Sequence, residues 1–301
     1  MSSPVVQNKS QNSGLFFAVA AFGFWGLVQP YFFGVYGDVN PLVVVAHRTF
    51  WSCGFIWLWL LMRGKISGGW TLLQDRKMAA LLALTGMLIF TNWGIYIYAV
   101  QAQRLLDASV GYFMTPLMTA GFGMIFLGER PRRLQLVALI LAAGGVLIYT
   151  LWLGRLPLIA LALSLTFSAY GGIRKKFAVP AERGMAVETL LLAPLALGFI
   201  LAFGWSGGPY FIAPNGGQAL WLASAGLVTL LPLVWYNAAA ARMPLISLGL
   251  LQFIVPVGLF ILSLLPPLNE TLDLQRGTLF IFVWAALVFY VIDLIRSSRV
   301  R

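Results

Sequence analysis

Residues 133–153, RLQLVALILAAGGVLIYTLWL, carry no charge after the first arginine. An α-helix needs about 20 apolar residues to cross the hydrocarbon of a bilayer, so this stretch predicts a membrane-spanning helix. Arginines border it on both sides, at positions 130 and 132 before it and at Arg155 after it. We therefore take a spanning helix between short basic loops as the pattern to look for in the rest of the chain.

Nine further segments follow the same pattern. The ten predicted spans cover residues 14–36, 41–62, 78–100, 105–128, 133–153, 156–177, 185–204, 217–240, 244–267 and 277–295. Only 10% of the 301 residues are charged and 60% are hydrophobic, whereas a soluble domain carries about 25% charged residues because its surface faces water. We therefore expect an all-α integral membrane protein with ten transmembrane helices.

The lysines and arginines indicate how these spans are oriented. With the N-terminus inside, the inner loops and tails hold 16 of them and the outer loops hold three, while Arg48 lies within a span. This bias predicts a cytoplasmic N-terminal tail (1–13) and a cytoplasmic C-terminal tail (296–301) in a bacterial-type inner membrane. The net charge of +11 thus resides in short loops, which argues against a nucleic-acid partner.

The two halves of the chain resemble each other. At an offset of 138 residues, Tyr98 matches Tyr236, Arg104 matches Arg242, Ser109 matches Ser247 and Gly111 matches Gly249; at an offset of 145, FGFWG (22–26) aligns with FSAYG (167–171). The order of these matches favours a duplication, with repeats over 14–153 and 156–295. Because each repeat has five spans, the second enters the membrane from the opposite side. Such inverted repeats can alternate between inward-open and outward-open states around a central cavity.

Several motifs carry a resemblance to a known family. In the first half they are HR at 47–48 with WS at 51–52, LDASVGYF at 106–113 with PL at 116–117, and FLGER at 126–130. In the second half they are YG at 170–171 with RKK at 174–176, ET at 188–189, and LG at 248–249 with Gln252 and Pro256. On these motifs the chain resembles the EamA type of the drug/metabolite transporter superfamily, and within it the RarD subfamily, often labelled chloramphenicol-sensitive proteins. The resemblance implies ten helices and export of small organic solutes.

His47 and Arg48 are the strongest candidates for a functional site. They lie six and seven residues after Pro41, so about 10 Å into the second span from its outer end. A buried arginine at that depth is costly unless it is paired, reaches the interface or faces water. Two interpretations stay open: a substrate anchor or coupling site facing the cavity, and a structural pair with Asp107, which can also act as a gate. His47, the only histidine, can titrate near neutral pH, but a satisfied interior histidine is favoured over a proton carrier.

Glu188 is the second charged candidate. It lies near the inner start of the seventh span and faces the basic residues 174–176. Pairing with this basic cluster is the favoured interpretation, and direct proton coupling is the alternative. Direct pairing with Arg48 is not expected, because the two charges lie near opposite faces.

Polar and aromatic residues within the spans form a further candidate set for the substrate cavity. They are Trp25, Gln29, Asn92, Tyr96, Tyr112, Tyr170, Trp235, Tyr236 and Gln252. Four prolines are expected to interrupt helices and free carbonyl groups, namely Pro30, Pro116, Pro232 and Pro256. We expect a pocket between the repeats that suits amphipathic, aromatic or zwitterionic molecules. The alternative for any single residue is an interface anchor or an interhelical hydrogen bond.

These observations favour a secondary-active or facilitative exporter, driven by the substrate gradient or by protons. No Walker motif is present, so ATP hydrolysis by this chain is not expected. An integral-membrane enzyme would need clustered carboxylates, metal ligands or a nucleophile pair, and nine acidic residues mostly in loops with one histidine do not provide them. A channel or scaffold fits the spans but leaves the inverted repeat without a purpose. The expected partners are a small-molecule substrate and the lipid bilayer, with no cofactor and no metal.

Overall fold

The computed structural model describes residues 4–34, 41–101, 105–205, 216–263 and 274–299. The regular elements in these ranges are all helices. The first segment is a helical rod of α1 (Pro4–Gly23), a π-helical turn η1 (Phe24–Val28) and α2 (Gln29–Gly34). The others are α3 (Pro41–Met62), α4 (Ile66–Gln74), α5 (Arg76–Gln101), α6 (Leu105–Leu127), α7 (Arg133–Leu153), α8 (Leu158–Lys176), α9 (Ala181–Trp205), α10 (Gly216–Ala240), α11 (Leu245–Gln252), α12 (Ile254–Ser263) and α13 (Leu274–Arg299).

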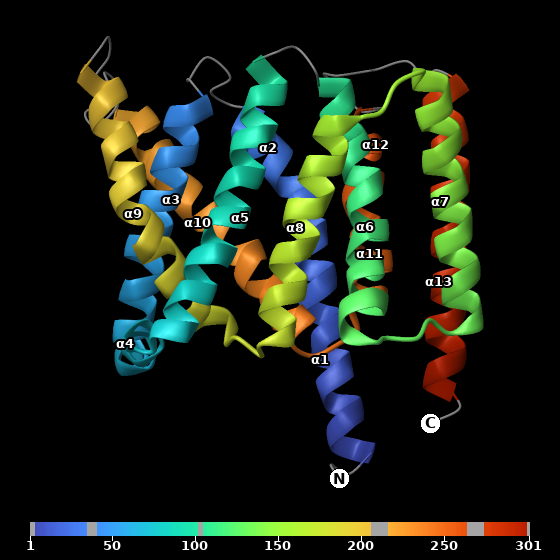
Figure 1. Cartoon of the computed structure of the whole chain (residues 1–301), viewed down its shortest axis with the longest axis horizontal. Helices are drawn as coiled ribbons and strands as arrows, with labels where there is room; N and C mark the ends of the chain where they lie inside the picture. Colours follow the sequence, from blue (N-terminus) through green and yellow to red (C-terminus); the bar gives the residue numbers. More distant parts are fainter. Residues whose placement is uncertain (1–3, 35–40, 102–104, 206–215, 264–273, 300–301) are drawn as a thin grey trace.

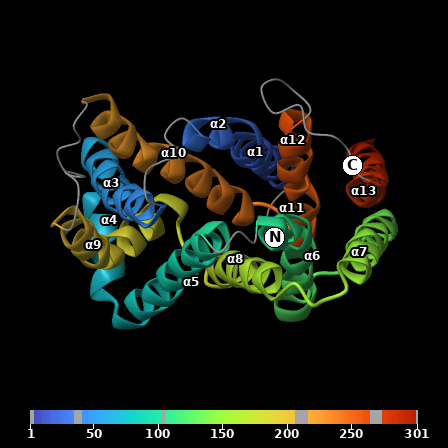
Figure 2. The same ribbon diagram turned by 90° about the horizontal axis from the view of Figure 1, so that it is seen from above.

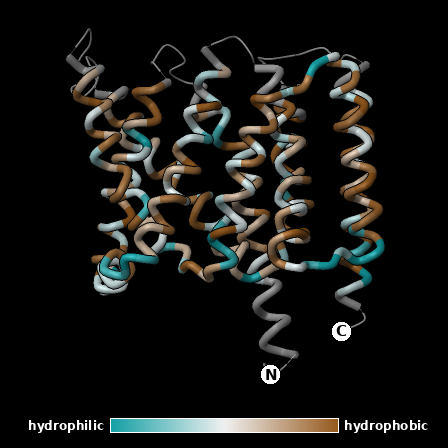
Figure 3. The backbone as a smooth tube through the Cα atoms, in the orientation of Figure 1, coloured by the Kyte–Doolittle hydropathy of each residue, from teal (hydrophilic) through white to brown (hydrophobic). Residues whose placement is uncertain are grey.

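The long helices stand side by side across the molecule, and both termini lie at its lower end in Figure 1. We call this the termini end and the opposite one the far end. Hydrophobic residues dominate the lengths of the helices, and hydrophilic residues gather at the termini end (Figure 3). This distribution is the one expected of helices surrounded by lipid.

Seven helices among the described residues are long and apolar enough to cross a membrane, and they lie in α3, α5, α6, α7, α9, α10 and α13. Two shorter apolar stretches, Ser13–Val28 and Leu245–Leu259, accompany them. α8 carries three consecutive cations in its last turn, Arg174, Lys175 and Lys176. The all-helical membrane architecture is therefore confirmed, with seven candidate spans.

The helices differ from the predicted segments at several places. α13 continues to Arg299, inside the predicted tail 296–301, and the predicted span 244–267 is divided into α11 and α12. α1 begins at Pro4, inside the predicted tail 1–13, because proline is well tolerated at the first helical position and no further proline or glycine occurs within that tail. α4 lies in the predicted loop between spans two and three. Its nine residues are too few to span a membrane, and the ring of its Trp70 lies 5.1 Å from that of Trp57 on α3.

The prolines behave in two ways. Pro30 lies two residues after the end of the π-helical turn, and Pro256 lies three residues after the break at Phe253 that separates α11 from α12. At both sites the missing N–H leaves a carbonyl four residues earlier without its helical partner. The prediction that Pro116 and Pro232 also interrupt helices is wrong, because α6 and α10 continue through them. Proline is tolerated inside membrane helices where neighbouring helices and local adjustments satisfy the freed groups.

Packing connects helices from the two halves of the chain. α6 packs against α8 and α11, α3 against α9 and α10, and α5 against α8 and α9. α1 packs against α10, and the α1–η1 rod contacts α11 and α12. α7 and α13 pack mainly against each other and stand at one edge of the molecule (Figure 2).

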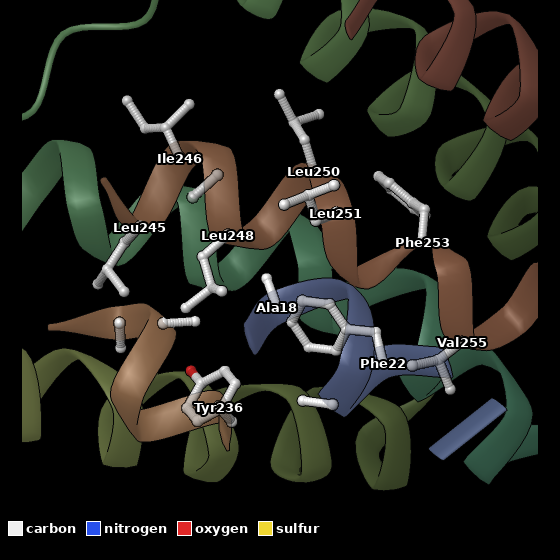
Figure 4. Close-up of a cluster of buried hydrophobic side chains, with 14 of the residues drawn as sticks. Ala18, Phe22, Tyr236, Leu245, Ile246, Leu248, Leu250, Leu251, Phe253 and Val255 are labelled. Atoms are coloured by element: carbon white, nitrogen blue, oxygen red, sulfur yellow. The ribbon is translucent and has the colours of Figure 1, made fainter. Parts of the chain in front are cut away.

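Small residues allow the closest helix approaches, as is usual between membrane helices. A Cβ atom added at Gly249 of α11 would lie 2.5 Å from the carbonyl oxygen of Pro116 on α6. One added at Gly26 of η1 would lie 3.0 Å from the carbonyl oxygen of Val255. Around these approaches, side chains of α11 and of α1 form part of the apolar core together with Tyr236 of α10 (Figure 4).

Candidate functional site

A cationic and aromatic group lies toward the far end. The guanidinium carbon of Arg48 on α3 lies 4.1 Å from the centroid of the Trp93 ring on α5. The side chains of Tyr96 on α5 and Tyr112 on α6 lie close to each other and to Arg48. Tyr96 and Tyr112 are 39% and 37% exposed, so this far-end group (Arg48, Trp93, Tyr96 and Tyr112) presents phenol faces beside a cation. Such a group can bind polar or aromatic molecules.

The structure describes only some of the expected neighbours of Arg48. His47 precedes it in α3, and its side chain is 3% exposed. The side chain of Asp107, the structural partner considered from the sequence, lies outside the described residues. One turn further along α3, the Ser52 hydroxyl donates a hydrogen bond of 2.7 Å to the Gly226 carbonyl, which joins α3 to α10. α3 is thus fixed to α10 close to Arg48.

A buried ion pair lies toward the termini end. Glu188 of α9 and Arg174 of α8 are 1% and 2% exposed, and Arg174 Nη1 lies 2.8 Å from Glu188 Oε2. The Thr85 hydroxyl of α5 donates to Glu188 Oε1 at 2.6 Å. Arg174 Nη2 donates to the carbonyls of Pro180 and Ala181 at 3.2 and 3.1 Å. The pairing of Glu188 with the basic cluster, the interpretation favoured from the sequence, is present in the structure.

Two further residues extend this polar group. The Tyr170 hydroxyl lies 3.5 Å from Glu188 Oε2 and accepts a hydrogen bond of 2.7 Å from Asn237 Nδ2 of α10. Thr85, Tyr170, Arg174, Glu188 and Asn237 therefore form one buried network, which we call the Glu188 cluster. It joins α5, α8, α9 and α10. Buried networks of this kind are costly to leave partly satisfied, so they favour one defined arrangement of the helices.

An aromatic cluster lies next to the Glu188 cluster. The Tyr236 ring lies 5.0 Å from Phe167, 5.9 Å from Trp25 and 6.1 Å from Phe22. Tyr236 and Phe22 are fully buried (Figure 4), whereas Trp25 and Phe167 are half-buried. The Tyr236 hydroxyl is buried and makes no hydrogen bond within the described residues. The cluster joins the α1–η1 rod, α8 and α10.

A second carboxylate ties helices together at the termini end. Glu129, just after α6, accepts hydrogen bonds from the backbone N–H groups of Leu245 at 2.9 Å and Ile246 at 3.0 Å. These are the first residues of α11, where a negative charge is favourable. Lys175 of α8 lies 3.7 Å from Glu129 Oε1 and donates to the carbonyls of Ala240, at 2.9 Å, and Met243. We call Glu129, Lys175 and these backbone groups the Glu129 cluster.

Other candidate residues lie apart from these clusters. Asn92 donates to the Leu163 carbonyl at 2.8 Å and to the Thr166 hydroxyl at 2.9 Å, which joins α5 to α8. Gln252 is buried and accepts a hydrogen bond of 3.3 Å from Thr119. Trp235 packs edge-on against Phe24 at 5.9 Å, and Gln29 is half-buried at the start of α2. Asn92 and Gln252 thus act as interhelical contacts, the alternative considered for them from the sequence.

The structure therefore divides the predicted site into separate groups. Arg48, Tyr96 and Tyr112 come together, Trp25 meets Tyr236, and Tyr170 meets Glu188. Sequence reasoning missed Thr85, Trp93, Glu129 as a helix cap, and Asn237. The last directly follows Tyr236 in the chain, and a polar residue at that depth was a signal that could have been used. Among the described residues, no three His, Cys, Asp or Glu side chains are placed to hold a metal ion.

Comparison with known proteins places the chain in a family. The model of the EamA-like transporter family matches residues 12–151. Protein RarD of Streptomyces exfoliatus is 40% identical over 291 residues, covering 96% of this chain and 91% of that protein. Protein RarD of Escherichia coli (strain K12) is 38% identical over 291 residues, with coverages of 97% and 98%.

A crystal structure of another protein has the same fold. It aligns with a TM-score of 0.71 over 94% of this chain and 98% of that one, at 19% sequence identity. The full-length RarD relatives extend the match beyond the family model into the second half of the chain. The chain therefore belongs to the EamA-like transporter family of the drug/metabolite transporter superfamily and is a RarD-like, multi-pass membrane transporter.

Proposed function

We propose that this transporter exports small organic solutes by alternating access between two inverted repeats of five spans each, over residues 14–153 and 156–295. The first repeat comprises the α1–η1–α2 rod, α3, α5, α6 and α7. The second comprises α8, α9, α10, the α11–α12 pair and α13. A repeat with an odd number of spans must reverse its direction in the second copy, and such a pair can exchange conformations.

The observation that carries this proposal is the exchange symmetry of the helix contacts. In the proposed correspondence the elements of the two repeats are matched in order, so α1 is matched with α8, α3 with α9, α5 with α10, α6 with the α11–α12 pair and α7 with α13. Exchanging the matched helices turns the α1–α10 contact into the α8–α5 contact, and the α3–α10 contact into the α9–α5 contact. Likewise α6–α8 becomes the contact of the α11–α12 pair with the α1–η1 rod. The contacts α3–α9, α6–α11 and α7–α13 map onto themselves. This set of contacts is the one expected for two copies related by a two-fold axis in the membrane plane.

Arg48 and Glu188 fit the same correspondence. Arg48 lies seven residues after Pro41, where α3 begins, and Glu188 lies seven residues after Ala181, where α9 begins. The two helices pack against each other, and each charge lies about 10 Å from the start of its helix. Inversion then places a cation in one half of the membrane and a carboxylate in the other. Charges at these depths are typical of substrate or ion pathways.

We place the substrate path between the far-end group and the aromatic cluster. Arg48, Tyr96 and Tyr112 supply a cation and phenols on one side, and Trp25 and Tyr236 supply aromatic faces on the other. These chemistries suit amphipathic molecules that are aromatic or zwitterionic, including amino-acid-like and drug-like solutes. Transport is driven by the solute gradient or by a proton gradient, without ATP.

We further propose that the termini end is cytoplasmic and that the protein resides in the inner membrane. The 16-to-3 distribution of lysine and arginine supports this orientation. Epitope tags at each terminus, probed with impermeant protease in inside-out and right-side-out vesicles, test it. Cleavage of both tags only in inside-out vesicles is the expected result.

Counterflow in proteoliposomes tests the transport mechanism. Vesicles preloaded with one solute from a panel of amino acids, metabolites and amphenicol-type drugs receive a trace of the labelled solute outside. An alternating-access carrier accumulates the label transiently, because the loaded solute drives exchange through one site. A channel gives equilibration without overshoot, and an enzyme gives a changed product without flux. Repeating the measurement with an imposed pH gradient separates proton coupling from facilitated exchange.

A further inference from the structure

Two carboxylates hold the termini ends of the proposed repeats together. The Glu188 cluster and the Glu129 cluster are anchored on consecutive residues of α8, Arg174 and Lys175. Both cations belong to the second repeat under the proposed correspondence. The partners of these clusters are distributed between both repeats, so their hydrogen bonds report how the repeats are joined at the cytoplasmic side.

The Glu188 cluster reaches from the second repeat into the first. The ion pair of Glu188 with Arg174 lies within the second repeat and holds the carboxylate in place. The remaining oxygen accepts the 2.6 Å hydrogen bond from Thr85, which belongs to α5 of the first repeat. Gly86, next to Thr85, packs against Glu188, since a Cβ added there would lie 3.6 Å from the Glu188 Cβ. Thr85 therefore provides the link between repeats, and Arg174 orients the group that receives it.

The Glu129 cluster reaches in the opposite direction. Glu129 belongs to the first repeat and caps the first N–H groups of α11 in the second. A Cβ added at Gly123 would lie 2.7 Å from Glu129 Oε2. Glycine at this position therefore leaves room for the Glu129 carboxylate. Lys175 approaches the same carboxylate and also donates to the backbone between α10 and α11. Each repeat thus contributes one carboxylate that engages the other repeat.

We propose that Thr85, Glu188, Glu129 and Lys175 form a cytoplasmic gate, which is closed in this structure and must release these hydrogen bonds for the inward-open state. This inference rests on the proposed alternating access. The fully buried Glu188 ion pair stays with the second repeat, while the contacts with Thr85 and α11 break and re-form. Such a division suits a gate, because a single hydrogen bond to a carboxylate costs less to break than a buried ion pair costs to separate.

Accessibility of a reporter thiol tests the gate directly. Ser168 of α8 is fully buried and lies six residues, about 9 Å along the helix, to the far-end side of Arg174. In a Cys53→Ser background, Ser168→Cys reports whether an impermeant maleimide added to inside-out vesicles passes the gate. Thr85→Val removes the hydroxyl with little change of shape, and Thr85→Ser retains it. Glu129→Gln weakens the second cluster.

We expect Thr85→Val and Glu129→Gln each to raise the labelling rate by about tenfold or more, since the closed state loses one hydrogen bond to a charged carboxylate. Thr85→Ser should label at the rate of the unaltered gate. Arg132→Gln is the matched control, because it breaks another ion pair at the same end, between Arg132 and Asp293. Size-exclusion profiles and melting temperatures identify any variant that has lost its fold.

Two results would overturn the gate. One is an unchanged labelling rate in folded Thr85→Val and Glu129→Gln. The other is an equal increase in Arg132→Gln, which would indicate general loosening of this end. Counterflow that persists with unchanged labelling rejects the gate and leaves alternating access intact. Equal labelling of Ser168→Cys from both membrane sides, without counterflow, rejects alternating access itself.

Discussion

Glu188→Gln removes one partner of a buried ion pair whose side chains are 1% and 2% exposed. Breaking such a pair costs about 3–5 kcal/mol, because the remaining charge stays buried without compensation. The cost should lie near the lower limit here, since Arg174 retains its hydrogen bonds to the Pro180 and Ala181 carbonyls. Glutamine also retains an oxygen that can accept the hydrogen bond from Thr85.

A double-mutant cycle separates the interaction free energy of Glu188 with Arg174 from the other effects of each substitution. Arg174→Gln alone leaves Glu188 as the uncompensated charge and should cost a similar amount. The double variant Arg174→Gln/Glu188→Gln has no buried charge, so it should be more stable than either single variant. At about 2 °C per kcal/mol, we expect each single variant to melt about 6 °C lower and the double variant only about 2 °C lower.

The assay is thermal unfolding of purified protein in one detergent, followed by tryptophan fluorescence. Glu182→Gln is the control on the same helix, because Glu182 lies in the first turn of α9 and its charge contributes only about 0.3–1 kcal/mol there. Additive losses in the double variant would refute the reasoning, since they would mean that the two charges do not stabilise each other. A loss in Glu182→Gln as large as in Glu188→Gln would do the same.

Three further outcomes follow from the packing and the contacts. Gly249→Ala introduces a Cβ 2.5 Å from the α6 backbone and should lower the free energy of unfolding by about 1–3 kcal/mol. In the control Gly94→Ala the Cβ meets nothing within 4 Å, so the melting temperature should stay unchanged or rise. Equal effects of the two substitutions would contradict the close approach at Gly249. Lys175→Met should lower the melting temperature by a few degrees, because the Ala240 and Met243 carbonyls lose their donor and Glu129 loses its ion-pair partner. Lys176→Met, at an exposed position, should leave the melting temperature unchanged. Arg48→Ala should abolish the rise in melting temperature that a transported solute gives the original protein, and Arg48→Lys should retain part of that rise. If the solute still raises the melting temperature of Arg48→Ala, Arg48 has a structural role.

The membrane helices could be predicted because the formation of each one depends on its own stretch of sequence. A helix in lipid must satisfy its own backbone hydrogen bonds, so length and hydropathy of a single window suffice. The predicted segments 41–62 and 133–153 have the same bounds as α3 and α7. α4 was missed because nine amphipathic residues satisfy no such window, and their helix depends on packing against α9 and α3.

The polar partners could be predicted only where they were close in sequence or topology. Glu188 was expected to meet the basic end of α8 because both lie beside the same short connection, and it pairs with Arg174. Glu129 stands out in the sequence only as part of the FLGER motif at 126–130, yet it caps α11 from 116 residues away. Nothing local distinguishes such a carboxylate from a solvated one.

The sequence by itself determined a chain of lipid-embedded helices, their order and the few residues too polar for that setting. Only the tertiary structure decided which helices touch, and therefore that Arg48 lies over Trp93 while Tyr170 and Asn237 join Glu188. The physical reason is that lipid is as apolar as the helix surfaces, so hydropathy does not select helix partners. Close approaches at small residues such as Gly249, and the need to satisfy each buried polar group, make that selection instead.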